Sequence, residues 1–321
     1  MQALGERVRR SPFKWRQPII ASIHTRPSTE FLSGRTIRGV IDVPKFGLAI
    51  SSNYFMEDER AGGLEPIVRG LAAAGIRGCE LSFKHVEPPV DIAVVRSVLD
   101  RHGVQAPTIH PPIGATNLGA LDEDHRRASV AEISACFEPY AALGGGAAIV
   151  HPSGSGVAPN KSLEWDEGNR AAHLDAFRRS LDELLRMAET LGIRLACENM
   201  PSHGRPRPGV LMEEVRAVID GYPQEVGLCL DTGHAYMSGL DPAAEARIAG
   251  ERLMALHLQD TDGVADRHWM PGQGDVDWAE LYAALTTMGF DGAWTFEVHV
   301  EPVAAAAAAG RVADGWVAGR F

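Results

Sequence analysis

Short apolar runs alternate with longer amphipathic segments from about residue 40 to the end of the chain. Each apolar run has the length of a buried strand, whereas the segments between them carry apolar residues at helical spacings of three and four. The predicted strands are residues 46–51, 78–83, 104–110, 146–151, 193–199, 226–231, 253–260 and 292–298. The gaps between them suit right-handed crossovers between parallel strands.

Two of the intervening segments predict helices clearly. Residues 168–191 place one apolar stripe along a helix, made of Leu174, Phe177, Leu181, Leu184, Leu185, Ala188 and Leu191. Residues 277–288 follow the segment GDVD, which offers an Asp as the helix cap, and they end near Gly289. The alanine-rich run after Pro302 is expected to form part of a terminal helix, because alanine favours that conformation.

Eight strands that alternate with helices predict an α/β protein with the (β/α)8 barrel fold, also called a TIM barrel. We assign residues 41–321 to one barrel domain and residues 1–40 to an amino-terminal extension. An open doubly wound sheet is the structural alternative, but no GxGxxG segment follows the first strand.

Composition narrows the class of protein. A chain of 321 residues that is 45% hydrophobic can bury a large core, and no apolar run reaches the ~18 residues of a membrane span. The four cysteines show no CxxC spacing and three lie in apolar runs, so we expect small buried hydrophobes and a cytoplasmic protein. No membrane partner is expected.

Charge is distributed unevenly around a net value of −11. Residues 1–40 carry eight Lys and Arg against two Glu, whereas the rest carries 23 basic against 40 acidic side chains. We expect the extension to be a solvated basic tail; contact with an anionic partner or another subunit is the alternative. The acidic body argues against nucleic acid as a partner.

Histidines and carboxylates gather where the predicted strands end, which is where a barrel of this kind places its active site. Four consecutive strands, the third to the sixth, end in His110, His151, Glu198 and Asp231. The later candidates are His234, His257, Asp266, His268 and Glu297. Glu80 lies inside the second strand.

Each of these residues taken alone has an ordinary structural interpretation. A histidine at a strand end often bonds its own loop, and Glu80 could pair with a nearby arginine. Together, however, the carboxylates would repel one another in one barrel mouth unless a cation or a shared proton neutralised them. Divalent zinc, manganese or cobalt accepts such a ring of carboxylates and imidazoles, so the sequence predicts a metal site.

The segments CEN, LDTGHA, HLQD, DRH, PGQGDVDW and a final FE carry a family resemblance. From about Phe46 to Val300 the chain resembles the xylose isomerase-like barrel superfamily, which joins sugar isomerases and epimerases with endonuclease IV. In the sugar enzymes one divalent metal is held by a set that falls here on Glu198, Asp231, His257 and Glu297. Endonuclease IV holds three zinc ions, and the additional positions fall on His110, His151, His234, Asp266 and His268, with Glu198 bridging two ions.

The resemblance therefore implies one to three ions of zinc, manganese or cobalt. It favours an isomerase or epimerase of a small sugar, keto-sugar or polyol, in which Glu198 and Glu297 act as proton-abstracting base and returning acid. We expect His234, Arg267 and His268 to orient hydroxyl groups, and Trp269 to form an apolar wall or simply to pack. The same resemblance allows a homo-oligomer.

Other functions remain open at this stage. A lyase or dehydratase would begin with the same proton abstraction, and a zinc phosphodiesterase of the endonuclease IV type would use all nine ligand positions. Against the nuclease, GLAISSNYF replaces the usual GAHVS opening, the acidic segment MEDE follows it, and PPIGATNLG lacks an aromatic wedge. A barrel that keeps its metal for stability or ligand sensing is the non-catalytic alternative.

Overall fold

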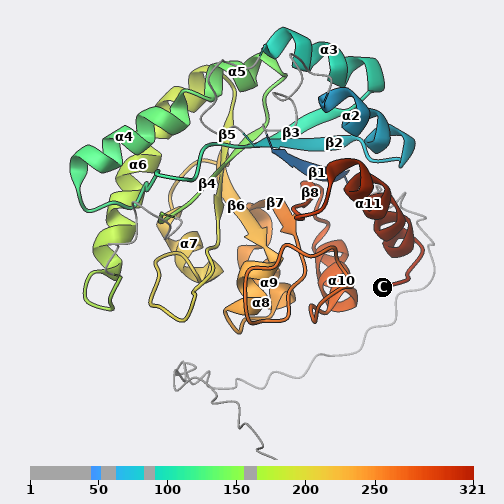
Figure 1. The fold of residues 1–321 in the computed structure, drawn as a ribbon. Coiled ribbons are helices and arrows are strands. Elements are labelled where there is room, and N and C mark those ends of the chain that lie inside the picture. The colour runs from blue at the N-terminus through green and yellow to red at the C-terminus, as the bar shows by residue number, and fades with distance from the viewer. Residues whose placement is uncertain (1–44, 52–62, 83–90, 155–164) are drawn as a thin grey trace, which may run out of the picture. The chain divides into compact units, whose positions relative to one another are not determined.

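The computed structural model describes residues 45–51, 63–82, 91–154 and 165–321 (Figure 1). The predicted extension, its boundary near residue 40 and the MEDE segment (56–59) lie outside these ranges. The described residues contain all eight predicted strands, and these pair in chain order into one closed parallel barrel, with β1 against β8. The predicted fold class is confirmed.

The strands start and stop within about two residues of their predicted limits. They are β1 (Lys45–Ser51), β2 (Gly78–Ser82), β3 (Gln105–His110), β4 (Ala147–Val150), β5 (Arg194–Glu198), β6 (Val226–Asp231), β7 (Leu253–Leu258) and β8 (Ala293–Phe296).

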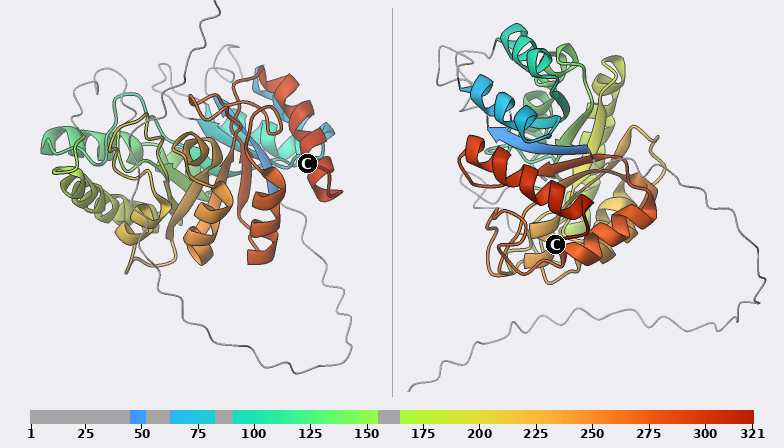
Figure 2. Two further views of the ribbon diagram at one scale, coloured as in Figure 1. Left: turned by 90° about the horizontal axis from the view of Figure 1, so that it is seen from below. Right: turned by 90° about the vertical axis from the view of Figure 1, so that its right-hand side faces the viewer.

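Helices surround the strands on the outside of the barrel (Figures 1 and 2). They are α2 (Leu64–Ala73), α3 (Ile92–His102), α4 (Glu123–Ser134), α5 (Phe137–Ala142), α6 (Arg170–Thr190), α7 (Met212–Val218), α8 (Thr232–Met237), α9 (Pro242–Ala249), α10 (Trp278–Met288) and α11 (Pro302–Val317), with the short 3₁₀ turn η2 (Gly250–Arg252) before β7. None of those described is long and apolar enough for a membrane crossing.

The helix limits follow from the chemistry of their ends. α10 begins where the Asp277 carboxylate accepts a hydrogen bond from the Glu280 N–H, and it stops at Gly289, whose φ of 68° is left-handed. α6 lies within the predicted segment 168–191, and the alanine-rich run forms α11. The short helix α8 was not predicted; it begins because Asp231 caps the His234 N–H.

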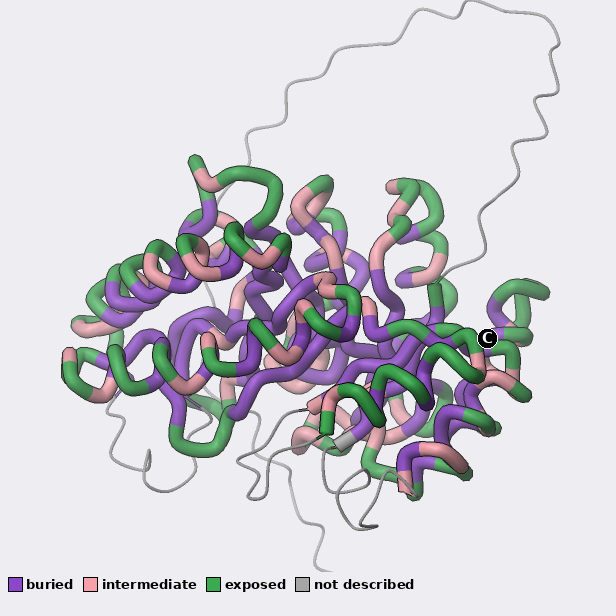
Figure 3. The backbone as a smooth tube through the Cα atoms, turned by 90° about the horizontal axis from the view of Figure 1, so that it is seen from above, coloured by how far each residue is buried: buried purple, intermediate pink, exposed green. Residues whose placement is uncertain are grey.

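Most residues of the strands are buried, and Figure 3 draws these stretches of the backbone in purple. One face packs against the helices, and a cluster of mostly small side chains fills the interior: Ala147, Ile149, Ala196, Cys229, Ala255 and Ala293. All four cysteines are free and buried, as predicted. Interior positions nearer the carboxyl ends are polar instead, and these build the site.

Candidate metal centre

The predicted ligands meet at the carboxyl ends of β3 to β8. His110, Glu198 and Asp231 are the last residues of β3, β5 and β6. His257 is the next-to-last residue of β7, and His151 and Glu297 directly follow β4 and β8. Because parallel strands of a closed barrel end at one rim, residues far apart in sequence come together there.

Four of these residues form the first group. The ligand atoms of Glu198, Asp231, His257 and Glu297 all lie within 4.8 Å of one another. His257 Nδ1 is 3.1 Å from Glu297 Oε2 and 3.4 Å from Glu198 Oε1. Asp231 and His257 are fully buried, whereas the Glu297 side chain keeps 24% of its exposure. The first group is thus a buried cluster in which Glu297 is the partly exposed member.

The surroundings of the His257 Nδ1 atom indicate whether the first group fits a cation. The other ring nitrogen, Nε2, faces the Glu80 carboxylate at 3.1 and 3.2 Å, which favours a proton on Nε2. Nδ1 is buried and makes no hydrogen bond within the part of the chain that the structure describes. It points at two carboxylates, an arrangement that either a proton on Nδ1 or a cation between the three groups would stabilise, so the residues fit a divalent ion.

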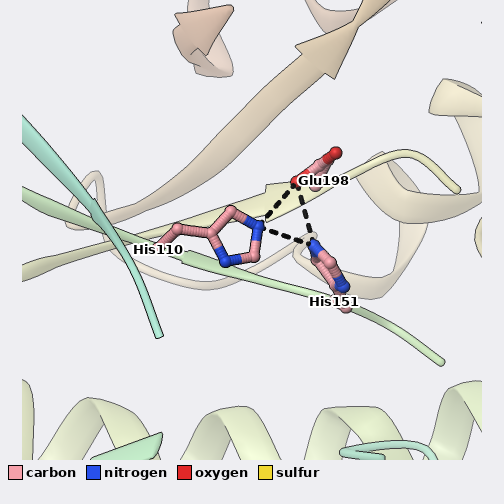
Figure 4. Close-up of side chains that lie close together, drawn as sticks. All are labelled: His110, His151 and Glu198. Carbon is pink, nitrogen blue, oxygen red and sulfur yellow. Dashed lines mark hydrogen bonds and ion pairs between the residues drawn. The ribbon is translucent and has the colours of Figure 1, made fainter. Parts of the chain in front are cut away.

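His110, His151 and Glu198 form the second group (Figure 4). The Nε2 atoms of the two histidines are 3.2 Å apart, and the one of His151 is 3.0 Å from Glu198 Oε2. His110 Nδ1 donates to the Pro111 carbonyl at 2.9 Å, so Nε2 is the nitrogen of His110 that is left to bind an ion. Two nitrogens and a carboxylate oxygen therefore converge on one point.

His234, Asp266 and His268 form the third group. Asp266 Oδ2 lies 3.3 Å from the Nε2 atoms of both histidines. The Nδ1 atoms face backbone carbonyls, that of Asn199 for His234 and that of Glu297 for His268. His268 also adopts a left-handed φ of 48°, a strained conformation of the kind that clusters at functional sites.

Glu198 belongs to the first two groups and also contacts the third. Its Oε1 is 3.3 Å from His234 Nδ1 and 3.4 Å from His257 Nδ1, while Oε2 faces His151. Burial alone would raise the pKa of Glu198, but the charges of His257 and His151 and hydrogen bonds from His110 and His151 hold it well below the usual range. Glu198 is the shared acceptor of the site.

Protonation balances the charges of the metal-free site. Burial raises the pKa of Asp231 to about 7, with Glu198 and Glu297 adding to the effect and His234 opposing it. Burial disfavours the charged form of His268, yet its hydrogen bond to Asp266 and the charge of Glu297 outweigh this and raise its pKa to about 9. A bound cation would replace these protons as the neutralising charge.

Gln259 and Asn199 hold the ligands, although the sequence analysis did not single them out. The buried Gln259 Nε2 donates to Asp266 at 2.7 Å and to both oxygens of Asp231 at 3.2 and 3.3 Å, while Oε1 accepts the His268 N–H. Asn199 Oδ1 accepts the Asp231 N–H at 2.7 Å. Their signal in the sequence is an amide residue one or two positions after a ligand, in the segments CEN and HLQD.

Arg207 is a further residue that the sequence analysis missed, and no motif marks it. Its buried guanidinium donates to Ser153 Oγ and the Gly154 carbonyl after β4, and to the Pro201 carbonyl after β5. It also lies over the Trp165 ring at 5.0 Å. Burial lowers its pKa to about 9. Arg207 thereby ties the loop that follows His151 to the loop that follows Glu198.

Arg267 and Trp269, the other predicted substrate contacts, lie beside the third group. Arg267 makes an ion pair with Asp262 at 2.8 Å and stacks over the Trp269 ring at 5.5 Å. Trp269 itself is held by backbone pairing with Asp260. Glu80, for which pairing with an arginine was one interpretation, faces His257 instead, because β2 and β7 both point these side chains into the barrel.

Comparison with known proteins gives a consistent picture. The family model described as xylose isomerase-like TIM barrel matches residues 68–316. An uncharacterised protein of Methanocaldococcus jannaschii is 28% identical over 262 residues, which is 80% of this chain and 84% of that protein. A probable endonuclease 4 of Thermoplasma acidophilum is 26% identical over 206 residues, 59% of this chain and 67% of that one.

Sugar epimerases are also similar. A D-psicose 3-epimerase of Enterocloster bolteae is 30% identical over 139 residues, 42% of each chain. A crystal structure of a D-psicose 3-epimerase in the presence of D-fructose superimposes with a TM-score of 0.69 at 20% identity, covering 86% of this chain and 99% of that one. The structural match supports the barrel fold.

Proposed function

This chain belongs to the xylose isomerase-like TIM barrel family, and we propose that it is a divalent-metal-dependent isomerase or epimerase of a small sugar or keto-sugar. The observation that carries the proposal is the first group, in which four ligand atoms from four consecutive strands lie within 4.8 Å of one another. The similarity to D-psicose 3-epimerase supports it.

Glu198, Asp231, His257 and Glu297 would hold the ion. When bound, a divalent ion polarises a carbonyl and stabilises the negative charge that develops on its oxygen, an effect worth several kcal/mol. Three carboxylates and one imidazole suit manganese or cobalt, whereas the histidines of the other two groups favour zinc.

Glu198 and Glu297 are the proton-transferring groups of the proposed reaction. Both carboxylates lie against His257 Nδ1, so both reach the same small volume. One takes the proton from the carbon beside the substrate carbonyl, and the electron pair moves toward the carbonyl oxygen. The other returns a proton to carbon, which completes isomerisation or inverts the centre; general acid–base catalysis contributes roughly 10²–10⁴-fold.

The third group and its neighbours are placed to bind the sugar. His268 is fixed by the Glu297 carbonyl and the Gln259 amide, and His234 by the Asn199 carbonyl. In our proposal these imidazoles and Arg267 orient hydroxyl groups, and Trp269 forms an apolar wall. A lyase or dehydratase would share the first proton abstraction and differ in losing a leaving group afterwards.

The test is solvent isotope exchange. The metal-loaded protein is incubated with a panel of ketoses in deuterated water, and deuterium is sought at the carbon beside the carbonyl. We expect exchange in the wild type and none in Glu198→Gln or Glu297→Gln. Glu138→Gln, which changes an exposed carboxylate on α5, is the matched control and should exchange normally. A wild-type rate in either site variant would refute the two-carboxylate mechanism.

A zinc phosphodiesterase of the endonuclease IV type is the second candidate, and the second and third groups favour it. They would allow a cluster of metals to generate hydroxide and to hold the attacking and leaving oxygens. Incubation with abasic duplex DNA separates the two functions: we expect no strand cutting. Cutting by a protein that carries three zinc ions per chain would replace the isomerase proposal.

A further inference from the structure

Glu80 is a buried carboxylate that belongs to none of the three ligand groups. It lies in the middle of β2, is 1% exposed, and points into the barrel interior beside Thr108 of β3, with which it is in register. Burying a carboxylate is costly unless a partner compensates for the lost hydration. Among the described residues, the partner of Glu80 is the imidazole of His257 on β7, across the barrel.

The contact between Glu80 and His257 determines which ring nitrogen of His257 faces the other ligands. Both Glu80 oxygens lie within 3.2 Å of Nε2, so Nε2 donates to Glu80 and Nδ1 is the nitrogen left to bind an ion. Nδ1 faces Glu198 and Glu297 on the opposite side of the ring. The ring plane is further held by stacking on His110, with centroids 5.8 Å apart and 24° between planes.

We propose that Glu80 is a positioning residue of the metal centre: a buried anion that fixes the orientation and tautomer of His257 so that Nδ1 binds the ion. Glu80 touches neither the ion nor the substrate. The inference rests on the metal centre of the proposed function but not on the reaction, since the same carboxylate would serve an isomerase or a phosphodiesterase. Outer carboxylates of this kind typically change metal affinity by about 10–100-fold.

Two substitutions separate the charge of Glu80 from its hydrogen bond. Glu80→Gln keeps the shape and one acceptor oxygen but loses the negative charge, so we expect metal affinity to fall about tenfold. Glu80→Leu loses both and should weaken binding by about 100-fold. Thr108→Val is the matched control, because it removes a neighbouring interior hydroxyl that has no hydrogen-bond partner among the described residues, and it should leave the affinity unchanged.

The experiment measures zinc and manganese dissociation constants of the full chain by competition with a chelator at one pH, without reference to turnover. Thermal melts of the metal-free proteins check folding, and Glu80→Gln carries the test if Glu80→Leu does not fold. Nitrogen-15 spectra of the zinc-loaded wild type should show the ion on His257 Nδ1 and a proton kept on Nε2. Unchanged affinity in a folded Glu80 variant, equal weakening by Thr108→Val, or an ion bound through Nε2 would overturn the inference.

These outcomes are distinct from failure of the proposed function. If the ketose panel shows no isotope exchange while the Glu80 variants bind metal weakly, the inference stands and the reaction is wrong. If exchange occurs and Glu80→Gln and Glu80→Leu bind metal like the wild type, the reaction stands and the role of Glu80 is wrong.

Discussion

Gly233 lies between the ligands Asp231 and His234, and we predict that it cannot carry even one additional carbon. It is part of α8, and its φ is not left-handed, so backbone conformation does not require glycine. Space does: a Cβ at Gly233 would lie 2.4 Å from both Cδ and Oε1 of Gln259. Gly233→Ala would therefore displace the side-chain amide of Gln259, which links the first and third groups.

The size of the effect follows from these contacts. Carbon atoms make ordinary contact from 3.4 Å, so the Gln259 side chain must retreat by about 1 Å. That movement breaks its hydrogen bonds to Asp231 and Asp266, and no water reaches the fully buried amide to replace them. Overpacking costs about 1–3 kcal/mol, and bonds to charged groups contribute about 1.5–3 kcal/mol. We expect a loss of about 3 kcal/mol in the free energy of unfolding.

Urea unfolding of the metal-free protein measures this loss. Gly70→Ala on α2 is the matched control, because its Cβ would meet Ala306 at an ordinary 3.6 Å and alanine favours a helix. The double variant Gly233→Ala, Gln259→Ala relieves the overlap, so its stability should exceed the additive expectation from the single variants. If Gly233→Ala proves as stable as the wild type, Gln259 has room to move and its linking role is refuted.

Three other predictions concern pH, the loop after β7 and the loop after β4. The metal-free protein should lose stability as the pH rises from 6.5 to 9. The folded state raises the pKa of His268 to about 9 and therefore holds a proton that the unfolded chain releases in this range. Thermal melts across the window measure the loss, and flat or rising stability would contradict the prediction. Asp260→Asn should cost about 2 kcal/mol in urea unfolding, since the buried Asp260 carboxylate accepts the Trp278 indole N–H and backbone N–H groups; a cost below about 0.5 kcal/mol would count against this. Arg207→Met should accelerate amide exchange at Gly154 by releasing the loop after β4, and an unaltered exchange rate there would rule this out.

The barrel could be predicted because its signal is local and repeated. Each strand is buried on both faces and therefore appears as a continuous apolar run, such as residues 226–231, and its limits are set by turn and cap residues nearby. The helix α8 escaped prediction because six residues are too short for a periodic pattern, and its start depends on a side chain that also belongs to the site.

The ligand positions could be predicted for a similar reason, since each is a polar residue at the end of an apolar strand. Their supporting residues could not. The contact of Glu80 with His257 exists only because β2 and β7 face each other across the barrel. Arg207 forms hydrogen bonds with residues some 50 positions away in the chain. Only the closed structure shows which buried polar groups satisfy one another.

The central claim is that Glu198, Asp231, His257 and Glu297 bind a divalent ion together. Crystals soaked in manganese or zinc and measured at the metal's absorption edge locate such an ion directly. We predict an anomalous peak within about 2.3 Å of a carboxylate oxygen from each of the three acids and of His257 Nδ1. A saturated crystal with no peak there, or with metal only elsewhere, would contradict the account.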